Sequence, residues 1–335
     1  MPESTTDLSR IPFSILELAS VPQGSNIPAT LKQVIRHAQQ ADLLGFHRIW
    51  LAEHHNLPSA VSSATSVLIA QVAAQTRRLK VGSGGIMLAN HSPLVIAEQF
   101  GTLEALHPGR IDLGLGRAPT YDPVTARALR RDPMREDHFA EEVEEVRALL
   151  GTDSSNRAVQ AWPGSNSQVP VFLLGSSLFT ARIAARKGLP YAFAGHLSPR
   201  YAHEALSLYR QQFQPSDVLN EPYSILTLPA VAAETDEQAE FLATTLKQKA
   251  WNLMHGKPDR LTPPIADLEL NWDQRTVEQV DSFLQLAVIG SPSTLRRKLS
   301  AIVEEYPVNE LMFTSDIFDA GMRIDALQHL IAAKR

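Results

Sequence analysis

The sequence predicts an α/β protein built as a closed (β/α)8 barrel, and two regularities of the chain predict it. Short apolar runs alternate with amphipathic stretches of helical spacing, a pattern typical of βα units on a parallel sheet. The runs number eight, which is the strand count of this barrel, and they are apolar almost throughout, as strands buried on both faces are. A doubly wound open sheet is the alternative. The predicted strands are residues 12–19, 48–55, 79–88, 110–118, 169–177, 191–196, 223–233 and 310–318.

Two of the stretches between these runs carry clear helix signals. Residues 29–45 have apolar residues at helical spacing and end at Gly45, which suits the left-handed position after a helix. Residues 92–110 begin with Ser-Pro, a favourable N-cap and first-turn pair, and end at Pro-Gly. Both stretches are therefore predicted as helices on the outside of the barrel.

Two connections are longer than the rest. An extended loop, residues 119–136, follows the fourth strand, and an insertion, residues 254–290, separates the seventh strand from the eighth. Long connections in a compact domain often cover a site, so residues 254–290 are predicted to form a mobile lid. No internal repeat or linker divides the chain, and residues 1–335 are expected to form a single domain.

Composition excludes several classes of protein. The chain has 335 residues, 44% of them hydrophobic, and a formal net charge of −5, so no nucleic-acid partner is expected. It has no cysteine, which excludes disulfides, thiolate metal ligands and a cysteine nucleophile. No apolar run approaches the roughly 18 residues of a membrane span, and the N-terminus does not resemble a signal peptide. We expect a cytoplasmic protein that does not associate with membranes.

In a (β/α)8 barrel the chemistry lies at the C-terminal ends of the strands, and the second strand ends on Glu53, His54 and His55. Successive strand residues point to opposite faces, so the two imidazoles cannot both face one cavity. No other histidine or carboxylate cluster has ligand spacing, and no metal site is predicted. A single imidazole facing the cavity would be a general base near neutral pH, and a structural histidine is the alternative.

The third strand is rich in glycine near its end. Gly82, Gly84 and Gly85, together with Ser83, leave one wall almost without side chains. A flat ring could lie against such a wall, and tight packing between strands is the alternative explanation.

The fourth strand carries Gly114 and Gly116 and ends at Arg117. Glycines in a strand often mark a close approach of backbone or ligand. Arg117 could neutralise a phosphate bound beside the neighbouring unit, and a surface arginine with an ion-pair partner is the alternative. The segment lacks the third glycine of a dinucleotide-binding fingerprint.

The fifth strand runs into Gly175, Ser176 and Ser177, and a helix follows. Exposed N–H groups at a helix start, joined by hydroxyls, form an anion site. Ser177 and Thr180 are three residues apart and can face one ligand from the first turn. A serine that only caps the helix is the alternative. Together, the four strand ends describe a site suited to a planar cofactor that carries a phosphate.

These motifs resemble the bacterial luciferase-like flavin monooxygenases, and above all the single-chain oxidoreductases of the MsnO8 or alkanal monooxygenase-like type. The likeness spans nearly the whole chain. It is most specific in "WLAEHHN", "ATSVLIA", "VGSGGIMLANHSPLVIAEQFGTL", "HPGRIDLGLGRAP" and "VFLLGSSLFTARIAARKGLPYAFA". The resemblance implies a (β/α)8 barrel that uses reduced FMN and O2 on a small organic substrate. A separate NAD(P)H:flavin reductase would supply the FMNH2.

The resemblance also implies residue roles. His54 matches the active-site histidine of the family, and Gly84-Gly85 matches a non-prolyl cis peptide beside the flavin ring. The phosphate-binding positions correspond to Arg117, Ser177 and Thr180. Ser176 occupies the position of a glutamate in luciferase, and Gly116 that of a reactive cysteine. These two departures argue against aldehyde-dependent light emission but leave flavin binding intact.

The family habit of dimerising through early helices makes residues 64–75 a candidate homodimer contact. The 254–290 segment matches the mobile lid region, and Leu16, Glu17 and Trp50 are expected to join it around the substrate.

Two alternative functions stay open. One is an F420-dependent hydride-transfer enzyme on the same barrel, with Arg127, Arg130, Arg131 and Arg135 as candidate contacts for its anionic tail. The other is a catalytically silent flavin-binding protein.

Overall fold

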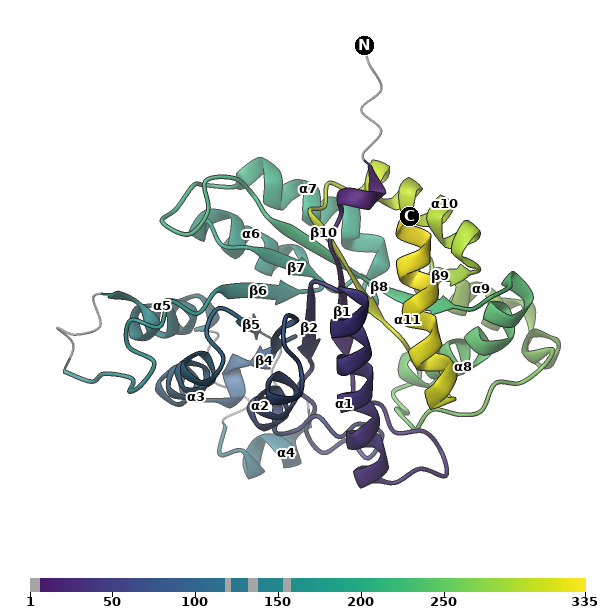
Figure 1. The fold of residues 1–335 in the computed structure, drawn as a ribbon, viewed down its shortest axis with the longest axis horizontal. Coiled ribbons are helices and arrows are strands. Elements are labelled where there is room, and N and C mark those ends of the chain that lie inside the picture. Colours follow the sequence, from purple (N-terminus) through teal and green to yellow (C-terminus); the bar gives the residue numbers. More distant parts are fainter. Residues whose placement is uncertain (1–6, 118–121, 132–137, 153–157) are drawn as a thin grey trace, which may run out of the picture.

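The fold is a closed parallel barrel surrounded by helices (Figure 1), as the sequence predicts. The computed structural model describes residues 7–117, 122–131, 138–152 and 158–335. Within them, eight parallel strands follow the order β10-β1-β2-β3-β5-β6-β7-β8, and pairing of β8 with β10 closes the ring, which rules out the open sheet. The barrel strands are β1 (Phe13–Glu17), β2 (Arg48–Leu51), β3 (Lys80–Ser83), β5 (Ile111–Gly116), β6 (Val171–Gly175), β7 (Tyr191–Phe193), β8 (Ser224–Ala232) and β10 (Glu310–Thr314).

Each of these strands lies inside one of the eight predicted runs, and the differences are local. The third run is not one strand, because it breaks at a cis Gly84–Gly85 bond into β3 and the short β4 (Ile86–Met87), which pairs with β5. The structure also adds β9 (Val288–Gly290), which pairs with the far end of β8 and which the sequence did not predict.

Helices form the outer layer. They are α1 (Ile27–Leu44), α2 (Thr65–Gln75), α3 (Pro93–Leu106), α4 (Pro123–Ala128), α5 (Phe139–Leu150), α6 (Leu178–Lys187), α7 (Ala202–Gln212), α8 (Asp236–Met254), α9 (Gln274–Phe283), α10 (Pro292–Glu305) and α11 (Ala320–Lys334). Short 3-10 turns are η1 (Leu8–Arg10), η2 (Leu88–Asn90), η4 (Pro199–Tyr201) and η5 (Leu268–Asn271). None of the described helices is long and apolar enough to cross a membrane.

Helix α1 shows how local sequence sets these elements. Asn26 caps it by accepting a hydrogen bond from Ala29 N, at 2.9 Å. Gly45 ends it with φ of 81°, a left-handed conformation that glycine adopts without strain. Its buried face includes Val34 and Ala38, which pack in the core between helices and barrel.

The two long connections differ in what the structure describes. The loop after the fourth strand contains α4, but residues 118–121 and 132–137, Arg135 among them, lie outside the described residues. The 254–290 insertion contains η5, α9 and β9. It is tied to the loop after β1, because Gln23 N donates to Leu261 O at 2.8 Å and Leu261 N donates to Val21 O at 3.0 Å.

A charged layer fills the N-terminal end of the barrel interior. Arg48 on β2 contacts Asp112 on β5 at 2.5 Å and Glu310 on β10 at 2.9 Å, with all three side chains buried. Its guanidinium lies over the ring of Phe172, with Cζ 4.9 Å from the ring centroid. Tyr223 donates a hydrogen bond to the second oxygen of Glu310, at 2.6 Å. The two neighbouring carboxylates raise the pKa of Arg48 against the effect of burial, so its charge is fixed.

We expect Arg48→Met to lower the free energy of unfolding by about 3–5 kcal/mol, because it leaves two buried carboxylates without their cation. Urea denaturation followed by circular dichroism measures this. Arg36→Met, on the exposed face of α1, is the matched control and should change stability by less than about 0.5 kcal/mol. Equal losses in the two variants would contradict a special role for the buried layer.

Candidate active site

A cavity of about 760 Å³ opens at the C-terminal ends of the barrel strands. Every site residue predicted from the sequence lines it, although the predicted positions come from four different strand ends. These residues are His54, Gly84, Gly85, Arg117, Ser176, Ser177 and Thr180. The fold therefore brings the predicted imidazole, glycine wall, arginine and helix start to one space.

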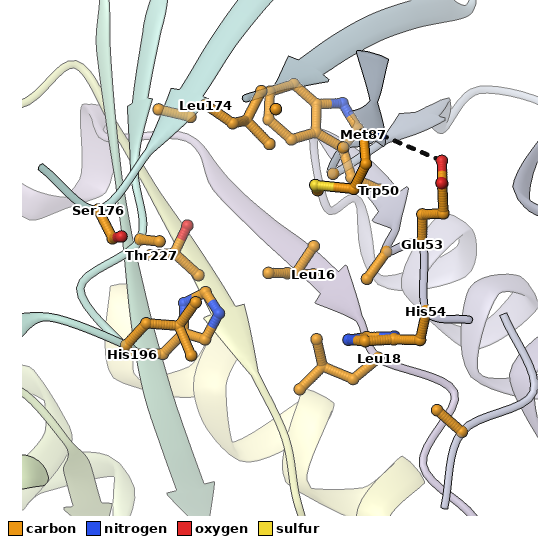
Figure 2. A pocket seen from close by; sticks show the side chains of 18 of the residues that line it. Leu16, Leu18, Trp50, Glu53, His54, Met87, Leu174, Ser176, His196 and Thr227 are labelled. Carbon is orange, nitrogen blue, oxygen red and sulfur yellow. Dashed lines mark hydrogen bonds between the residues drawn. The ribbon is translucent and has the colours of Figure 1, made fainter. Parts of the chain in front are cut away.

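His54 reaches into this cavity just beyond the end of β2 (Figure 2). Its backbone N–H donates to Ser62 O at 3.3 Å, and its Nδ1 lies 3.2 Å from the Ser62 hydroxyl. Burial, and then the positive charge of Lys249, lower the pKa of His54 to about 4. The ring is therefore neutral at pH 7 and offers one donor and one acceptor nitrogen.

Glu53, directly before His54, has a structural role as a hydrogen-bond acceptor. Its carboxylate accepts hydrogen bonds from Met87 N at 3.1 Å and from the Asn90 amide at 3.2 Å. The Nε2 atoms of His55 and His91 lie 2.7 and 2.9 Å from the same carboxylate. Glu53 thus fastens the end of β2 to the segment that follows the cis Gly84–Gly85 bond.

The prediction that His54 and His55 point apart is confirmed, since His54 lines the cavity and His55 binds Glu53. Among the described residues, Glu53, His55 and His91 are close enough to share a metal ion. Each imidazole hydrogen-bonds the Glu53 carboxylate, and these two bonds account for the proximity of the three side chains.

The glycine wall combines the two explanations that the sequence left open. A Cβ on Gly84 would lie 2.9 Å from Trp50 Cβ, and one on Gly85 would lie 2.9 Å from Gly114 O. Tight packing therefore requires glycine at both positions. Both residues also line the cavity, where their bare backbone leaves a flat surface.

The start of α6 forms the opposite part of the lining. Ser177 is the N-cap residue of α6, yet its side chain makes no capping hydrogen bond. The alternative that this serine only caps the helix is therefore wrong. Thr180 is buried in the first turn, and a Cβ on Gly175 would lie 2.7 Å from its Oγ1. Arg117 lies beside this turn, with Cζ 4.2 Å from the ring centroid of Phe179. A cation, hydroxyls and the N–H groups of a helix start converge here, as in anion sites.

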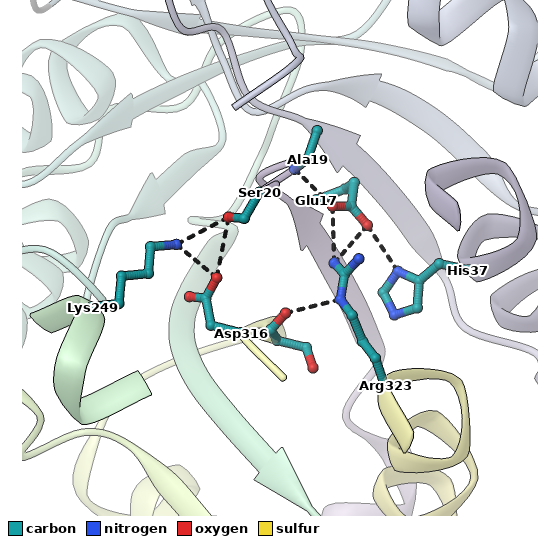
Figure 3. Close-up of polar contacts among 8 residues, drawn as sticks. Glu17, Ala19, Ser20, His37, Lys249, Asp316 and Arg323 are labelled. Carbon is teal, nitrogen blue, oxygen red and sulfur yellow. Dashed lines mark hydrogen bonds and ion pairs between the residues drawn. The ribbon is translucent and has the colours of Figure 1, made fainter. Parts of the chain in front are cut away.

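The cavity also has residues that the sequence argument missed: Leu18, Ser20, His196, Thr227 and Lys249. His196 ends the predicted 191–196 run, so its place at a strand end was a signal that could have identified it. Lys249 lies on α8 and carried no such signal. It is ion-paired with Asp316 at 2.6 Å, and its Nζ donates to the Ser20 hydroxyl at 3.2 Å (Figure 3).

One expected wall residue is wrong. Leu16 and Trp50 line the cavity as expected, but Glu17 does not. Its carboxylate contacts His37 Nδ1 at 2.9 Å and Arg323 at 2.8 Å, and it accepts a hydrogen bond from Ala19 N (Figure 3). Alternation along β1 explains the difference, because Leu16 and Glu17 point to opposite faces of the strand.

Comparison with known proteins identifies the family. The family model for luciferase-like monooxygenases matches residues 11–310. The chain belongs to the luciferase-like monooxygenase family. It is 43% identical to a luciferase-like monooxygenase of Escherichia coli (strain K12), over 95% of both chains. It is 36% identical to the N-acetyl-S-alkylcysteine monooxygenase of Bacillus subtilis (strain 168), over 97% of this chain and all of the relative.

Solved structures agree with this assignment. The crystal structure of apo-MsnO8 superposes with a TM-score of 0.89 at 34% identity, covering 96% of this chain and 98% of that one. The family that the sequence motifs predict is therefore confirmed, and so is the barrel.

We expect stability to fall as the pH drops from about 6.5 towards 4. Burial lowers the pKa of His54 and of His196 to about 4, whereas both titrate near 6.5 when unfolded. In this range the unfolded chain binds more protons, so acid favours unfolding. Each ring should account for about 2 kcal/mol between pH 7.5 and 5. His54→Asn should reduce the loss measured by urea denaturation, whereas His203→Asn, on the exposed face of α7, should not. An unchanged loss in His54→Asn would contradict the burial effect.

Proposed function

We propose that this protein is an FMN-dependent monooxygenase that uses reduced FMN and O2 on a small organic substrate. The observation that carries the proposal is the joining of an anion site, a flat glycine wall and a neutral imidazole in one cavity. Bound reduced FMN would activate O2, deliver one oxygen atom to the substrate and release the other as water. The protein supplies binding, orientation and control of protons.

The residues present fit FMN. Arg117 and the start of α6, with Ser176, Ser177 and Thr180, would hold its phosphate through charge and hydroxyl donors. The backbone at Gly84–Gly85 would lie against its ring, because no Cβ projects there. The phosphate contacts and the glycine wall border the same cavity, so one ligand with a ring and a phosphate can reach both.

His54 would manage the proton near the flavin ring. One of its ring nitrogens is held by Ser62, so the orientation of the imidazole is fixed and its other nitrogen can serve the reaction. Because the ring is neutral at pH 7, this free nitrogen can take up a proton during the reaction and return it afterwards. Apolar neighbours, including Leu16, Leu18 and Met87, would keep water away from the reacting atoms.

Reduced FMN would come from a separate NAD(P)H:flavin reductase. The sequence supports this division, because "GLGRAP" lacks the third glycine of a nicotinamide-binding fingerprint. The 254–290 segment supplies Pro258 and Asp259 to the cavity lining, which supports its role as a lid over the substrate.

A homodimer contact through the early helices is part of the same proposal. Helices α1, α2 and α3 are neighbours in the outer layer (Figure 1). Each exposes a large apolar side chain, namely Leu43 at 73%, Val67 at 66% and Leu106 at 63%. A partner subunit would cover these side chains.

Arg117→Ala should weaken FMN binding by about tenfold to a hundredfold, because a charge-assisted phosphate contact contributes about 1.5–3 kcal/mol. Flavin fluorescence titration measures the dissociation constant. Riboflavin, which has no phosphate, should bind the native protein and the variant alike. Arg200→Ala is the matched control, since Arg200 also lies over an aromatic ring, that of Tyr201, but away from the cavity lining. A larger effect of Arg117→Ala on riboflavin than on FMN would contradict the phosphate assignment.

Anaerobic titration with reduced FMN and with F420, followed by addition of O2, tests the function itself. We expect the protein to bind reduced FMN, and oxygenation of S-alkylated N-acetylcysteines is the first activity to assay because of the named relative. His54→Ala should keep its FMN affinity within about threefold and lose turnover, with more of the O2 recovered as hydrogen peroxide. Tight F420 binding without reduced-FMN binding would favour the hydride-transfer alternative. Bound reduced FMN that reoxidises as free flavin does, in both proteins, would favour a silent flavin-binding protein.

A further inference from the structure

A second imidazole faces His54 across the cavity. His196 lies three residues beyond the end of β7, and its ring reaches into the cavity from the side opposite His54 (Figure 2). Its Nδ1 is buried and has no hydrogen-bond partner among the described residues. Because Nδ1 is buried, Nε2 is the ring nitrogen that a ligand in the cavity can reach.

The proposed cofactor contacts do not use His196. The phosphate donors lie at α6 and Arg117, the ring wall lies at Gly84–Gly85, and the proton is assigned to His54. No described residue hydrogen-bonds the His196 ring, and an unsatisfied polar group at a cavity wall is costly to maintain and often serves a ligand.

The charges around His196 are balanced. Lys249 on α8 is paired with Asp316, which follows β10, and both act on the ring together with His54. Burial, followed by Lys249, lowers the pKa of His196 to about 4, so the ring is neutral at pH 7. Asp259 from the insertion also borders the cavity. Among the described residues that act on the His196 ring, Lys249 is the cation, and its charge is already paired with Asp316.

Other lining residues set the polarity of the cavity. Leu18, Leu197, Leu253 and Met312 are apolar, and Thr227 on β8, beside His196, adds a hydroxyl (Figure 2). A molecule bound here would be largely apolar and would carry a single polar group towards the two imidazoles.

We propose that His196 is a substrate-binding residue, and that its Nε2–H donates a hydrogen bond to an uncharged oxygen acceptor on the substrate, between His196 and His54. The inference rests on the proposed function, since it places the substrate beside bound FMN. It identifies the group recognised as a neutral acceptor rather than a carboxylate.

Three probes of similar shape test the inference: benzamide, which offers an uncharged oxygen, benzoate, which is anionic, and toluene, which has no acceptor. Each is titrated into the FMN-loaded protein, and binding is followed by the change in flavin absorbance. We expect benzamide to bind at least tenfold more tightly than either benzoate or toluene. In His196→Leu the preference for benzamide over toluene should fall about tenfold, whereas FMN affinity should stay within twofold.

His196→Gln, which keeps an amide donor, should retain most of the preference. His203→Leu, at an exposed position on α7, is the control and should behave as the native protein. An unchanged benzamide preference in His196→Leu, or tightest binding of benzoate, would overturn the inference while leaving FMN binding intact. Failure of the native protein to bind FMN would instead overturn the proposed function.

A measurement on the native protein covers the case in which His196→Leu does not fold. The ring nitrogens of ¹⁵N-labelled histidine report the tautomer and its hydrogen bonds directly. Benzamide should shift the Nε2 signal of His196 in the FMN-loaded protein, and toluene should not. Equal responses to the two probes would contradict a hydrogen bond from this ring.

Discussion

The buried contact of Arg48 with Asp112 and Glu310 is the constraint on which the rest of the structure depends. It joins β2, β5 and β10 across the interior of the barrel, where all three charged side chains are buried. Such a cluster adds little net stability compared with apolar packing, but it tolerates only one arrangement, because each carboxylate must find its donor. Ser14 on β1 and Tyr223 before β8 also donate to Glu310, which extends the constraint to five elements of the barrel.

The position of the cavity relative to this charged layer is set by the two-residue period of the strands. Two residues beyond Ser14, Arg48 and Glu310, the same inward face carries Leu16, Trp50 and Met312, which form an apolar layer with Phe172. Trp50 also donates to Asp112 at 3.1 Å, which links the two layers. Leu16, Trp50 and Met312 of this apolar layer form the floor of the cavity. The strands that carry the layer therefore fix the positions of His54, the glycine wall and the start of α6 around it.

Local pattern predicts most of this, and long-range contacts explain what it misses. Apolar runs indicate the strands and capping residues indicate the helix ends, because both signals lie within a few neighbouring residues. The break at Gly84–Gly85 is invisible in that pattern, since glycines occur both in strands and between them. Glu17 was misplaced because it alternates with Leu16 along β1 and points away from the cavity, and because Arg323, one of its partners, lies 306 residues further along the chain. Lys249 lies on α8, so the strand ends gave no signal for it, whereas His196 ends a predicted strand and could have been identified by that position.

In the "EHH" segment, Glu53 to His55, the sequence predicts the directions of the two imidazoles but not the role of the carboxylate. Alternation alone separates His54 from His55, but it does not say what Glu53 is for. The structure answers through Met87 and Asn90, whose donors meet the Glu53 carboxylate and fasten the segment after the cis bond to the end of β2. His91 and His55 complete the set of donors, and together they hold the pKa of Glu53 below its usual range, although burial alone would raise it. The negative charge of Glu53 thus holds the cavity wall in place, while the neighbouring His54 imidazole stays neutral and available to a ligand.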